Sequence, residues 1–496
     1  MRIVHPGDDD YIKSRQISNA RFNELEPNPI CFCSTDDDVR EALGMTGLRG
    51  VRLRSGRHHH EGMCSGEQVL VLDISPMNSI SMSDLGATLT VGPGAKLRDI
   101  YARMSQSKRI LPGGGCGDVC IGGLVQGAGW GLYSREYGLT CDRLVQFTII
   151  KADGSRATVH RPAQGERDLF WAVAGGGGGN FGVVTEFVFE LGMRPDTVWS
   201  VEITWDDASL IEKVVSEWCE KFPDSDTKLT TFCRVTAPDK KKPAKPTDPP
   251  VLISGTYLGS NKEQIGQLLA KLLPGTLGKS SKVSIEPQAP TGHVPHYQPG
   301  PPAEAIRAFR AAAGQELAAE EPQSLADTCG LDPYPHKVSS CFPGGGFGEK
   351  AIKFLANYVR GSDSEETARR YLSLHCLGGR NIRDEAAKDR SSFFWRDKPF
   401  ILQYQAWWTD PSDKSPVTKR CMAWVSAFRD GMIDYTEGSF INFPDRSLPV
   451  KETDPTKALK ELLRYYYSDN LEDLIRIKRE VDPLNQFWFE MGIPKE

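Results

Sequence analysis

The sequence has 496 residues, of which 39% are hydrophobic and 25% charged, an ordinary composition for a globular protein. A net charge of -5 and a pI near 6.1 provide no basic surface for nucleic acid, and no apolar run is long enough to cross a bilayer. One hydrophobic core rarely serves a chain of this length, so we expect two domains and small-molecule partners, with neither nucleic acid nor a membrane among them.

The chain begins with a segment that lacks the apolar stretch and small-residue cleavage site of a secretory signal, which predicts a cytoplasmic protein unless a signal has been removed. Short strands and helices follow. Strands are predicted at Ile30–Cys33, Val51–Arg54, Val69–Ile74, Thr88–Gly92 and Leu144–Ile150, and helices at Ser34–Gly44 and Leu97–Met104. This pattern favours an α+β fold over a regular βαβ repeat.

From about Val198 the pattern changes to longer strands separated by amphipathic helices, and a second domain is expected to start there. Strands are predicted at Val201–Trp205, Lys228–Val235 and Val251–Leu258, and helices at Ala208–Lys221 and Gln264–Leu273. The proline-rich stretches Ala237–Pro250 and Gln288–Pro302 are expected to be loops. Near the end, Ala458–Arg479 is predicted to form one helix. The twelve cysteines follow no framework spacing, which favours reduced thiols.

Glycine clusters raise the question of a nucleotide site. Gly177–Gly182 satisfies the spacing G-x-G-x-x-G, but a dinucleotide fingerprint needs a helix after it. Here the β-branched and aromatic run Val183–Leu191 follows, which predicts a strand. A Rossmann site is therefore disfavoured, yet glycines packed at 113–115, 122–123, 127–131 and 175–179 indicate that backbone approaches something closely.

Two motifs carry a family resemblance. Arg54-Ser-Gly-Arg-His-His-His-Glu-Gly62 follows a predicted strand, and Leu111–Gly131 contains Gly-Gly-Gly-Cys116-Gly-Asp-Val119-Cys-Ile-Gly-Gly123. With Asn442-Phe-Pro-Asp445 and the tail at 470–485, they resemble the berberine-bridge-enzyme-like branch of the vanillyl-alcohol-oxidase superfamily, in the family's order and over nearly the whole chain. The resemblance implies a two-domain, PCMH-type FAD-binding fold. Residues 1–195 would form the FAD-binding domain, 196–437 a substrate-binding domain of antiparallel sheet covered by helices, and 438–496 a return that completes the first domain.

The resemblance also implies FAD bonded covalently to the chain, at the 8α-methyl group through His58 and at C6 through Cys116, with Cys120 as the fallback for Cys116. Backbone amides would bind the pyrophosphate and the polar edge of the ring. It places the following residues against the cofactor: Arg54, Ser55, Gly56, Arg57, His59, Val119, Gly122, Gly123, Gly182, Val183 and Asn442. A metal at His58–His60 is disfavoured, because consecutive residues of an extended loop point to opposite sides.

The catalytic base must be sought elsewhere than in the family, because Phe440 and Phe443 stand where the family has tyrosines and phenylalanine cannot take a proton. His60 is the first candidate, since histidine accepts a proton near neutral pH. Tyr404 is the second. It lies on the predicted strand Ile401–Trp408, which puts Gln403, Gln405 and Trp407 on one face and Tyr404 on the other. One face is expected to line the pocket, so His60, Tyr404 and Gln403 are the predicted catalytic residues.

Together these features predict an oxidase that takes hydride from a hydroxyl-bearing carbon to flavin N5 and reduces O2 to H2O2. The small Val119 is where the resemblance places a gate for oxygen, which favours an oxidase over a dehydrogenase. The expected substrate is a sugar, an oligosaccharide or a hydroxyl-bearing secondary metabolite. Oxidative cyclisation or dearomatisation is one alternative, and a flavin-binding protein with little turnover is another. The lone histidines His293, His296, His336 and His375 are expected to be surface or satisfied core residues.

Overall fold

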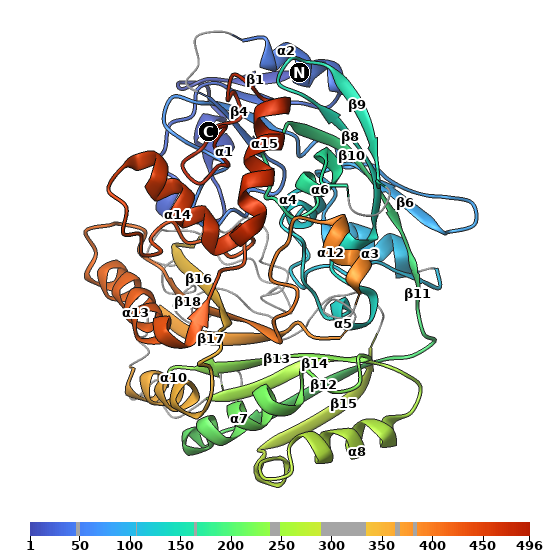
Figure 1. Cartoon of the computed structure of the whole chain (residues 1–496), viewed down its shortest axis with the longest axis vertical. Helices are drawn as coiled ribbons and strands as arrows, with labels where there is room; N and C mark the ends of the chain where they lie inside the picture. Colours follow the sequence, from blue (N-terminus) through green and yellow to red (C-terminus); the bar gives the residue numbers. More distant parts are fainter. Residues whose placement is uncertain are drawn as a thin grey trace.

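The computed structural model describes residues 1–45, 50–105, 107–162, 166–238, 249–288, 334–362, 368–379 and 384–496 (Figure 1). Most of the two predicted proline-rich loops, together with His293 and His296, lies outside these ranges. Within them no cysteine forms a disulfide. A search of the same ranges finds no helix with the length and apolar character needed to cross a membrane.

Two sheets form the N-terminal part, coloured blue to teal in Figure 1. The first has the order β1 (Arg2–Val4), β2 (Ile30–Phe32), β4 (Leu70–Asp73), β3 (Val51–Arg54), with the last three strands parallel. The second is antiparallel: β5 (Ile80–Met82), β6 (Thr88–Val91), β10 (Val183–Glu190), β8 (Leu144–Ile150), β9 (Arg156–His160). β10 is the strand that follows the last glycine cluster, so the helix required by a dinucleotide fingerprint is absent there.

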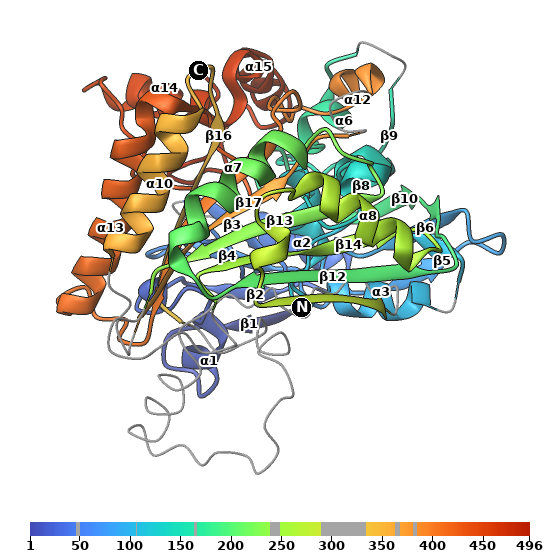
Figure 2. The same ribbon diagram turned by 90° about the horizontal axis from the view of Figure 1, so that it is seen from below.

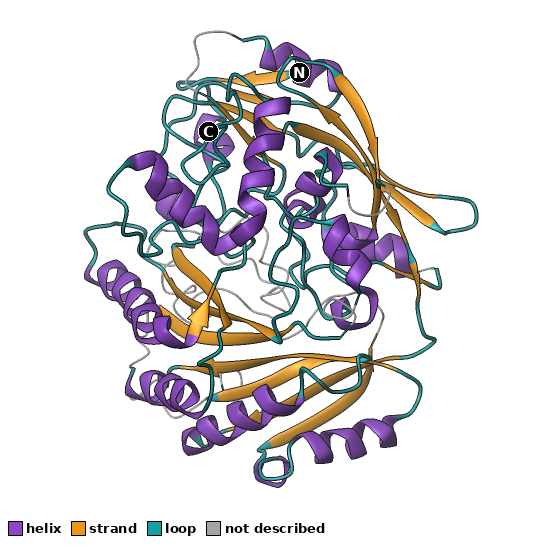
Figure 3. Ribbon diagram, in the orientation of Figure 1, coloured by secondary structure: helices purple, strands orange, loops and turns teal. Residues whose placement is uncertain are grey.

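Short helices connect these strands (Figure 3). They are α1 (Tyr11–Arg15), α2 (Asp36–Leu43), α3 (Leu97–Ser105), α4 (Ile121–Gln126), α5 (Ser134–Tyr137) and α6 (Leu169–Val173). The start of α2 is fixed by a capping box, in which Thr35 accepts from the amide of Asp38 and the Asp38 carboxylate bonds back to Thr35. Strands β7 (Arg109–Ile110) and β11 (Gly192–Met193) form a separate antiparallel pair in this part of the chain.

An eight-stranded sheet forms the middle of the chain and is the scaffold of the site. Its order is β15 (Lys282–Gln288), β12 (Val198–Trp205), β14 (Val251–Leu258), β13 (Leu229–Thr236), β17 (Ala368–Cys376), β18 (Phe400–Trp408), β16 (His336–Pro343), β19 (Thr436–Glu437). Helices α7 (Ile211–Lys221), α8 (Lys262–Leu272), α10 (Glu349–Gly361) and α13 (Pro416–Met432) accompany the sheet (Figures 1 and 2). Residues of all four helices share one apolar core with the sheet. Its central strands are buried along their whole length, which is why they do not alternate apolar and polar residues as a half-exposed sheet would.

The C-terminal segment returns to the N-terminal part, where its side chains join the same apolar core. It forms two helices, α14 (Pro455–Tyr467) and α15 (Leu471–Val481), and not the single helix predicted for Ala458–Arg479. The break lies at Ser468, whose φ of 44° is incompatible with a continuous right-handed helix. Apolar periodicity continues across the break, so periodicity alone concealed it. The short α12 (Glu385–Arg390) contacts α6.

Candidate active site

A cavity of about 320 Å³ lies between the N-terminal part, the eight-stranded sheet and the C-terminal return. One side, here called the glycine wall, is formed by backbone at Gly56, Gly114, Gly115, Gly122, Gly123 and Gly177–Gly179. A second side, here called the sheet wall, is formed by Phe232, Tyr334, His336, Gln403, Gln405 and Trp407. The volume of the cavity lies at the lower end of the range typical of small-molecule sites, about 300–1,000 Å³.

Most residues predicted for the site converge on this cavity. It is lined by Arg54, Ser55, Gly56, Arg57, His58, His59, His60, Cys116, Val119, Gly122, Gly123, Gln403 and Asn442. Cys120 also lines it, but its thiol donates to the carbonyl of Gly94 at 3.2 Å, and burial raises its pKa to about 12. That thiol is poorly suited to react, because the thiolate is the nucleophile.

Tyr404 was predicted as a base, and the structure places it elsewhere. Its ring is buried among the helices on the other face of β18, with its centroid 5.0 Å from that of Phe428. Its phenol oxygen accepts from the Ser339 hydroxyl at 3.0 Å, and burial raises its pKa well above the ordinary value. The two-residue period of the strand predicted two faces correctly but could not tell which one faces the cavity.

Gly182 and Val183 were predicted to contact the cofactor, and neither lines the cavity. Val183 begins β10, pairs with Ile150 of β8 and has a fully buried side chain. A Cβ built on Gly182 would lie 2.7 Å from the carbonyl of Ile150, so this glycine allows two strands to approach. Gly177–Gly179 and Asn180, slightly earlier in the chain, are the residues that reach the cavity.

The glycine wall passes a direct test of fit to a bound ring system. A Cβ built on Gly123 meets no atom within 4 Å, although the residue lies inside helix α4, so the missing side chain leaves open cavity. At Gly122, in contrast, a Cβ would lie 2.8 Å from the carbonyl oxygen of Pro93, so that glycine is needed for packing. Asn442 also lines the cavity, and its amide donates to the Leu124 carbonyl at 3.0 Å. Backbone and open volume, not side chains, therefore shape this wall.

Buried ion pairs to Asp73 stabilise the loop that follows β3 and carries His58. Arg54 donates to Asp73 at 2.8 Å, and both side chains are buried. Arg57 donates to the same carboxylate at 3.0 Å while its backbone adopts a φ of 63°. Burial alone would raise the pKa of Asp73, but these two guanidinium groups hold it below its usual value. The strained turn at Arg57 is thus stabilised by an ion pair, as expected where a loop must follow one path.

His58 and Cys116 line the same cavity from two separate loops. Burial lowers the pKa of His58 to about 4, against the opposing attraction of Asp118, which lies two residues after Cys116. The imidazole is therefore neutral at physiological pH and has a lone pair available. His59 is different, because its Nδ1 accepts from the amides of Glu61 at 3.2 Å and Met63 at 3.4 Å. It fixes the shape of the loop.

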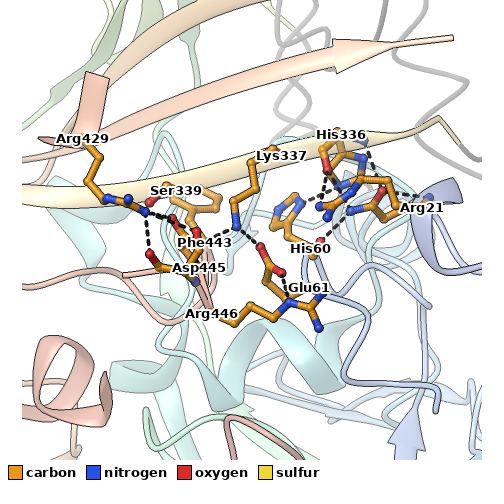
Figure 4. A network of polar contacts seen from close by, with 12 residues as sticks. Arg21, His60, Glu61, His336, Lys337, Ser339, Arg429, Phe443, Asp445 and Arg446 are labelled. Atoms are coloured by element: carbon orange, nitrogen blue, oxygen red, sulfur yellow. Dashed lines mark hydrogen bonds and ion pairs between the residues drawn. The ribbon is translucent and has the colours of Figure 1, made fainter. Parts of the chain in front are cut away.

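His60 connects the two walls (Figure 4). Its Nδ1 lies 3.0 Å from Nε2 of His336 on β16, and Nδ1 of His336 lies 2.9 Å from the carbonyl oxygen of Tyr334. The amide of Asn19 donates to the carbonyls of both His60, at 2.6 Å, and His336, at 3.0 Å. His336 was expected to be a surface or satisfied core residue. It is buried and satisfied, but it also lines the cavity, and no local signal around it identified that role.

Buried charges lie beside this histidine pair (Figure 4). Lys337 forms ion pairs with Glu61 and, at 2.5 Å, with Asp445, and all three side chains are at most 1% exposed. Burial acts to raise the pKa of Asp445, but Lys337 holds it below its ordinary value. The three residues come from the histidine loop, from β16 and from the C-terminal return, so their ion pairs join the three parts of the molecule that enclose the cavity.

The sheet wall carries two amides. Gln403 contacts Nε2 of His375 at 3.0 Å, and Gln405 accepts from the indole of Trp407 at 2.8 Å. An indole N–H only donates, so the oxygen of Gln405 must face Trp407 and its nitrogen points away. This face of β18 therefore offers hydrogen-bonding groups among aromatic rings. Within the described ranges, no three His, Cys, Asp or Glu side chains gather as a metal site would require.

Comparison with known proteins agrees with this geometry. Family models match residues 27–160 as an FAD binding domain and residues 439–494 as berberine and berberine like. The uncharacterised FAD-linked oxidoreductase YgaK of Bacillus subtilis is 28% identical over 498 residues, covering 99% of this chain and 96% of its own. The structure of berberine bridge enzyme-like 28 from Arabidopsis thaliana superposes with a TM-score of 0.80 at 23% identity, over 99% of this chain and 98% of that one. The chain has an FAD binding domain and a berberine-like C-terminal domain, and it is an FAD-linked oxidoreductase similar over its whole length to berberine bridge enzyme-like proteins.

A further structural neighbour of this chain is glucooligosaccharide oxidase from Acremonium strictum, described with a 6-S-cysteinyl, 8α-N1-histidyl FAD. Its TM-score is 0.78 at 20% identity, over 100% of this chain and 97% of that one. The predicted α+β, PCMH-type FAD-binding fold and the FAD cofactor are confirmed. The domain boundaries at 195 and 437 and the roles of individual site residues stay predictions.

Proposed function

We propose that this berberine bridge enzyme-like protein is an oxidase with FAD attached through His58 and Cys116, which oxidises a hydroxyl-bearing small molecule and releases H2O2. The observation that carries the proposal is that His58, Cys116 and His60 line one cavity. When bound, FAD would accept a hydride, which carries both electrons, from the substrate carbon, and O2 would take up those two electrons with two protons as H2O2.

Attachment is supported by the state of the two side chains. A neutral His58 has a ring nitrogen with a lone pair to bond with, and Cys116 is a partly exposed thiol outside any disulfide. The cysteinyl, histidyl flavin named for glucooligosaccharide oxidase provides a precedent on the same fold. Arg54, Arg57 and Asp73 hold the histidine loop in place, and the open space at Gly123 leaves room for the ring.

The proton chemistry is assigned to His60, which faces the cavity and takes the proton of the substrate hydroxyl. Phe443, whose ring centroid lies 6.1 Å from that of His60, and Trp407 provide apolar surfaces for the carbon skeleton of the substrate. A hydroxyl-bearing ring, from a sugar or a secondary metabolite, suits this combination of aromatic rings and amides.

Acid precipitation tests the attachment. Yellow colour should stay with the precipitated wild-type protein, and a spectrum should distinguish His58→Ala from Cys116→Ala, each of which retains one bond. The double variant should release its flavin. A colourless wild-type pellet would defeat the covalent claim, and Cys120→Ala serves as the matched control that keeps its colour.

Peroxide release tests the reaction. Wild-type protein in air should form H2O2 with at least one member of a panel of sugars, oligosaccharides and phenols. His60→Ala should load flavin but release little peroxide. A protein that carries flavin and stays silent on the whole panel, with O2 and with artificial electron acceptors, would instead be a binding protein.

A further inference from the structure

The hydrogen bonds around His336 determine where protons sit in the site. A carbonyl oxygen can only accept, so the contact of 2.9 Å between Nδ1 of His336 and the Tyr334 carbonyl requires a proton on Nδ1. His336 is 1% exposed and lies close to Lys337 and to Arg21, whose guanidinium is 3.5 Å from the His336 carbonyl, so a second proton is disfavoured. Its Nε2 is therefore an acceptor.

That acceptor fixes the state of His60. Because Nε2 of His336 has only a lone pair to offer, Nδ1 of His60, 3.0 Å away, must donate. A neutral imidazole carries one proton, so Nε2 of His60 is bare. Nδ1 is the ring nitrogen of His60 that is hydrogen-bonded within the described part of the chain, and the ring lines the cavity.

The orientation of the pair is fixed as tightly as its protonation. His336 stacks on Trp407 with ring centroids 4.0 Å apart, and it meets His60 edge-on at 5.1 Å. The Asn19 side chain ties the two backbones together, since it donates to both carbonyls and accepts from the His336 amide at 3.2 Å. Neither ring can turn without losing a buried hydrogen bond or a stacking contact.

We propose that His336 is a positioning residue, which holds His60 in the tautomer protonated at Nδ1 and thereby directs the bare Nε2 of His60 at the substrate hydroxyl. The inference rests on the proposed role of His60 as base. The substrate proton passes to Nε2, and the positive charge that forms on His60 stays hydrogen-bonded to the lone pair of His336. The carboxylates of Glu61 and Asp445 compensate the nearby Lys337.

The first test is the tautomer itself. In ¹⁵N-histidine-labelled holoenzyme, solid-state NMR should show the His60 ring protonated at Nδ1 and bare at Nε2, with its signals assigned by their loss in His60→Gln. In His336→Phe, which keeps a ring against Trp407 but removes the acceptor, the proton should redistribute between the two nitrogens. Exposed His160, on β9, supplies the control, because His160→Gln should leave the His60 signals and turnover unchanged.

The second test is kinetic. His336→Phe should lower kcat by about tenfold to a hundredfold and leave KM within about twofold, because orientation and not binding is lost. His336→Gln, whose side-chain oxygen can accept from His60, should restore most of kcat. His336→Leu removes the same acceptor and replaces the Phe variant if that protein fails to retain flavin.

Each outcome has one meaning. A proton on Nε2 of wild-type His60, or an unchanged His60 spectrum in both His336→Phe and His336→Leu, overturns the inference whatever the turnover. Full turnover of His60→Ala removes the proposed base and leaves the tautomer result standing, so the two failures are distinguishable.

Discussion

The glycine wall and the sheet wall enclose one cavity but are built in opposite ways. The glycine wall is made of loops and the short helix α4, and it presents backbone and open space. The sheet wall is carried mainly by strands β16 and β18, which are buried along their whole length, with Phe232 of β13 and Tyr334 beside them. A cofactor that stays in place needs close backbone approach, whereas a substrate is chosen by side chains on a rigid scaffold.

This contrast explains how the two walls respond to change. A side chain added to the glycine wall either fills the cavity, as at Gly123, or strikes neighbouring backbone, as at Gly122. A side chain exchanged on the sheet wall leaves the strand pairing intact, because the backbone hydrogen bonds of β18 do not depend on which residue faces the cavity. Substitutions on the glycine wall should therefore change cofactor retention, and substitutions on the sheet wall should change substrate turnover.

The largest effect is expected at His60, which reaches from the first wall to the second. His60→Ala should lower kcat by about 10²–10⁴-fold, the usual contribution of a general base, with flavin content unchanged. Stopped-flow reduction of the bound flavin by substrate measures the chemical step directly. A fall of less than about tenfold would assign the proton transfer to another group.

The same residue sets the expected pH dependence. Burial lowers the pKa of His60 to about 3, so the base is unprotonated across the physiological range and is lost only when the pH falls toward that value. The acid limb of kcat/KM should therefore lie below about pH 5 and not near the ordinary histidine pKa of about 6.5. A midpoint near 6.5 would contradict the buried, neutral histidine pair.

The next largest effect concerns the ion pairs that join the walls. Lys337→Met should lower the free energy of unfolding by about 3 kcal/mol, the lower end of the usual cost of breaking a buried ion pair. Glu61 and Asp445 would lose their buried partner and keep only the longer ion pairs with Arg446, at 3.3 Å, and Arg429, at 3.5 Å. Urea denaturation followed by fluorescence measures the loss of stability. Lys398→Met, which removes an ion pair with exposed Glu437, is the matched control and should cost at most about 1 kcal/mol.

A smaller effect separates cofactor retention from folding. Gly123→Leu places a side chain in open cavity and suits a helix interior better than glycine by about 0.5–1 kcal/mol. The apoprotein should keep its thermal midpoint while flavin content, measured by absorbance, falls. Gly122→Ala should instead lower the thermal midpoint of the apoprotein, because its Cβ would clash with the Pro93 carbonyl. Equal flavin content in Gly123→Leu and wild type would contradict this account of the glycine wall.

The smallest effect is expected at Tyr404. Tyr404→Phe removes one buried hydrogen bond to Ser339, which costs about 1 kcal/mol of stability, and should leave kcat within about twofold of wild type. Steady-state peroxide release checks it. A large loss of turnover would mean that the far face of β18 takes part in the reaction.

Much of this contrast could be predicted from the sequence, and the part that could not has a physical reason. The glycine wall is made of a few short glycine-rich motifs, each contiguous in sequence, so the glycines clustered beside His58 and Cys116 reveal it. The sheet wall is assembled by strand pairing, which opposes His336 to Trp407 across a long stretch of chain. A single sequence contains no signal of that register, and for the same reason the face of β18 that carries Gln403 could not be distinguished from the one that carries Tyr404.

Asn19 shows how far the site extends beyond the segments that identify the protein. The matched FAD binding domain begins at residue 27, yet the side chain that fastens His60 to His336 lies before it. Replacing Asn19 with leucine would leave the glycine wall and both histidines in the chain but remove the fastening between them. Such a protein should bind flavin normally but turn over slowly, so an assay of flavin content alone would not detect the loss.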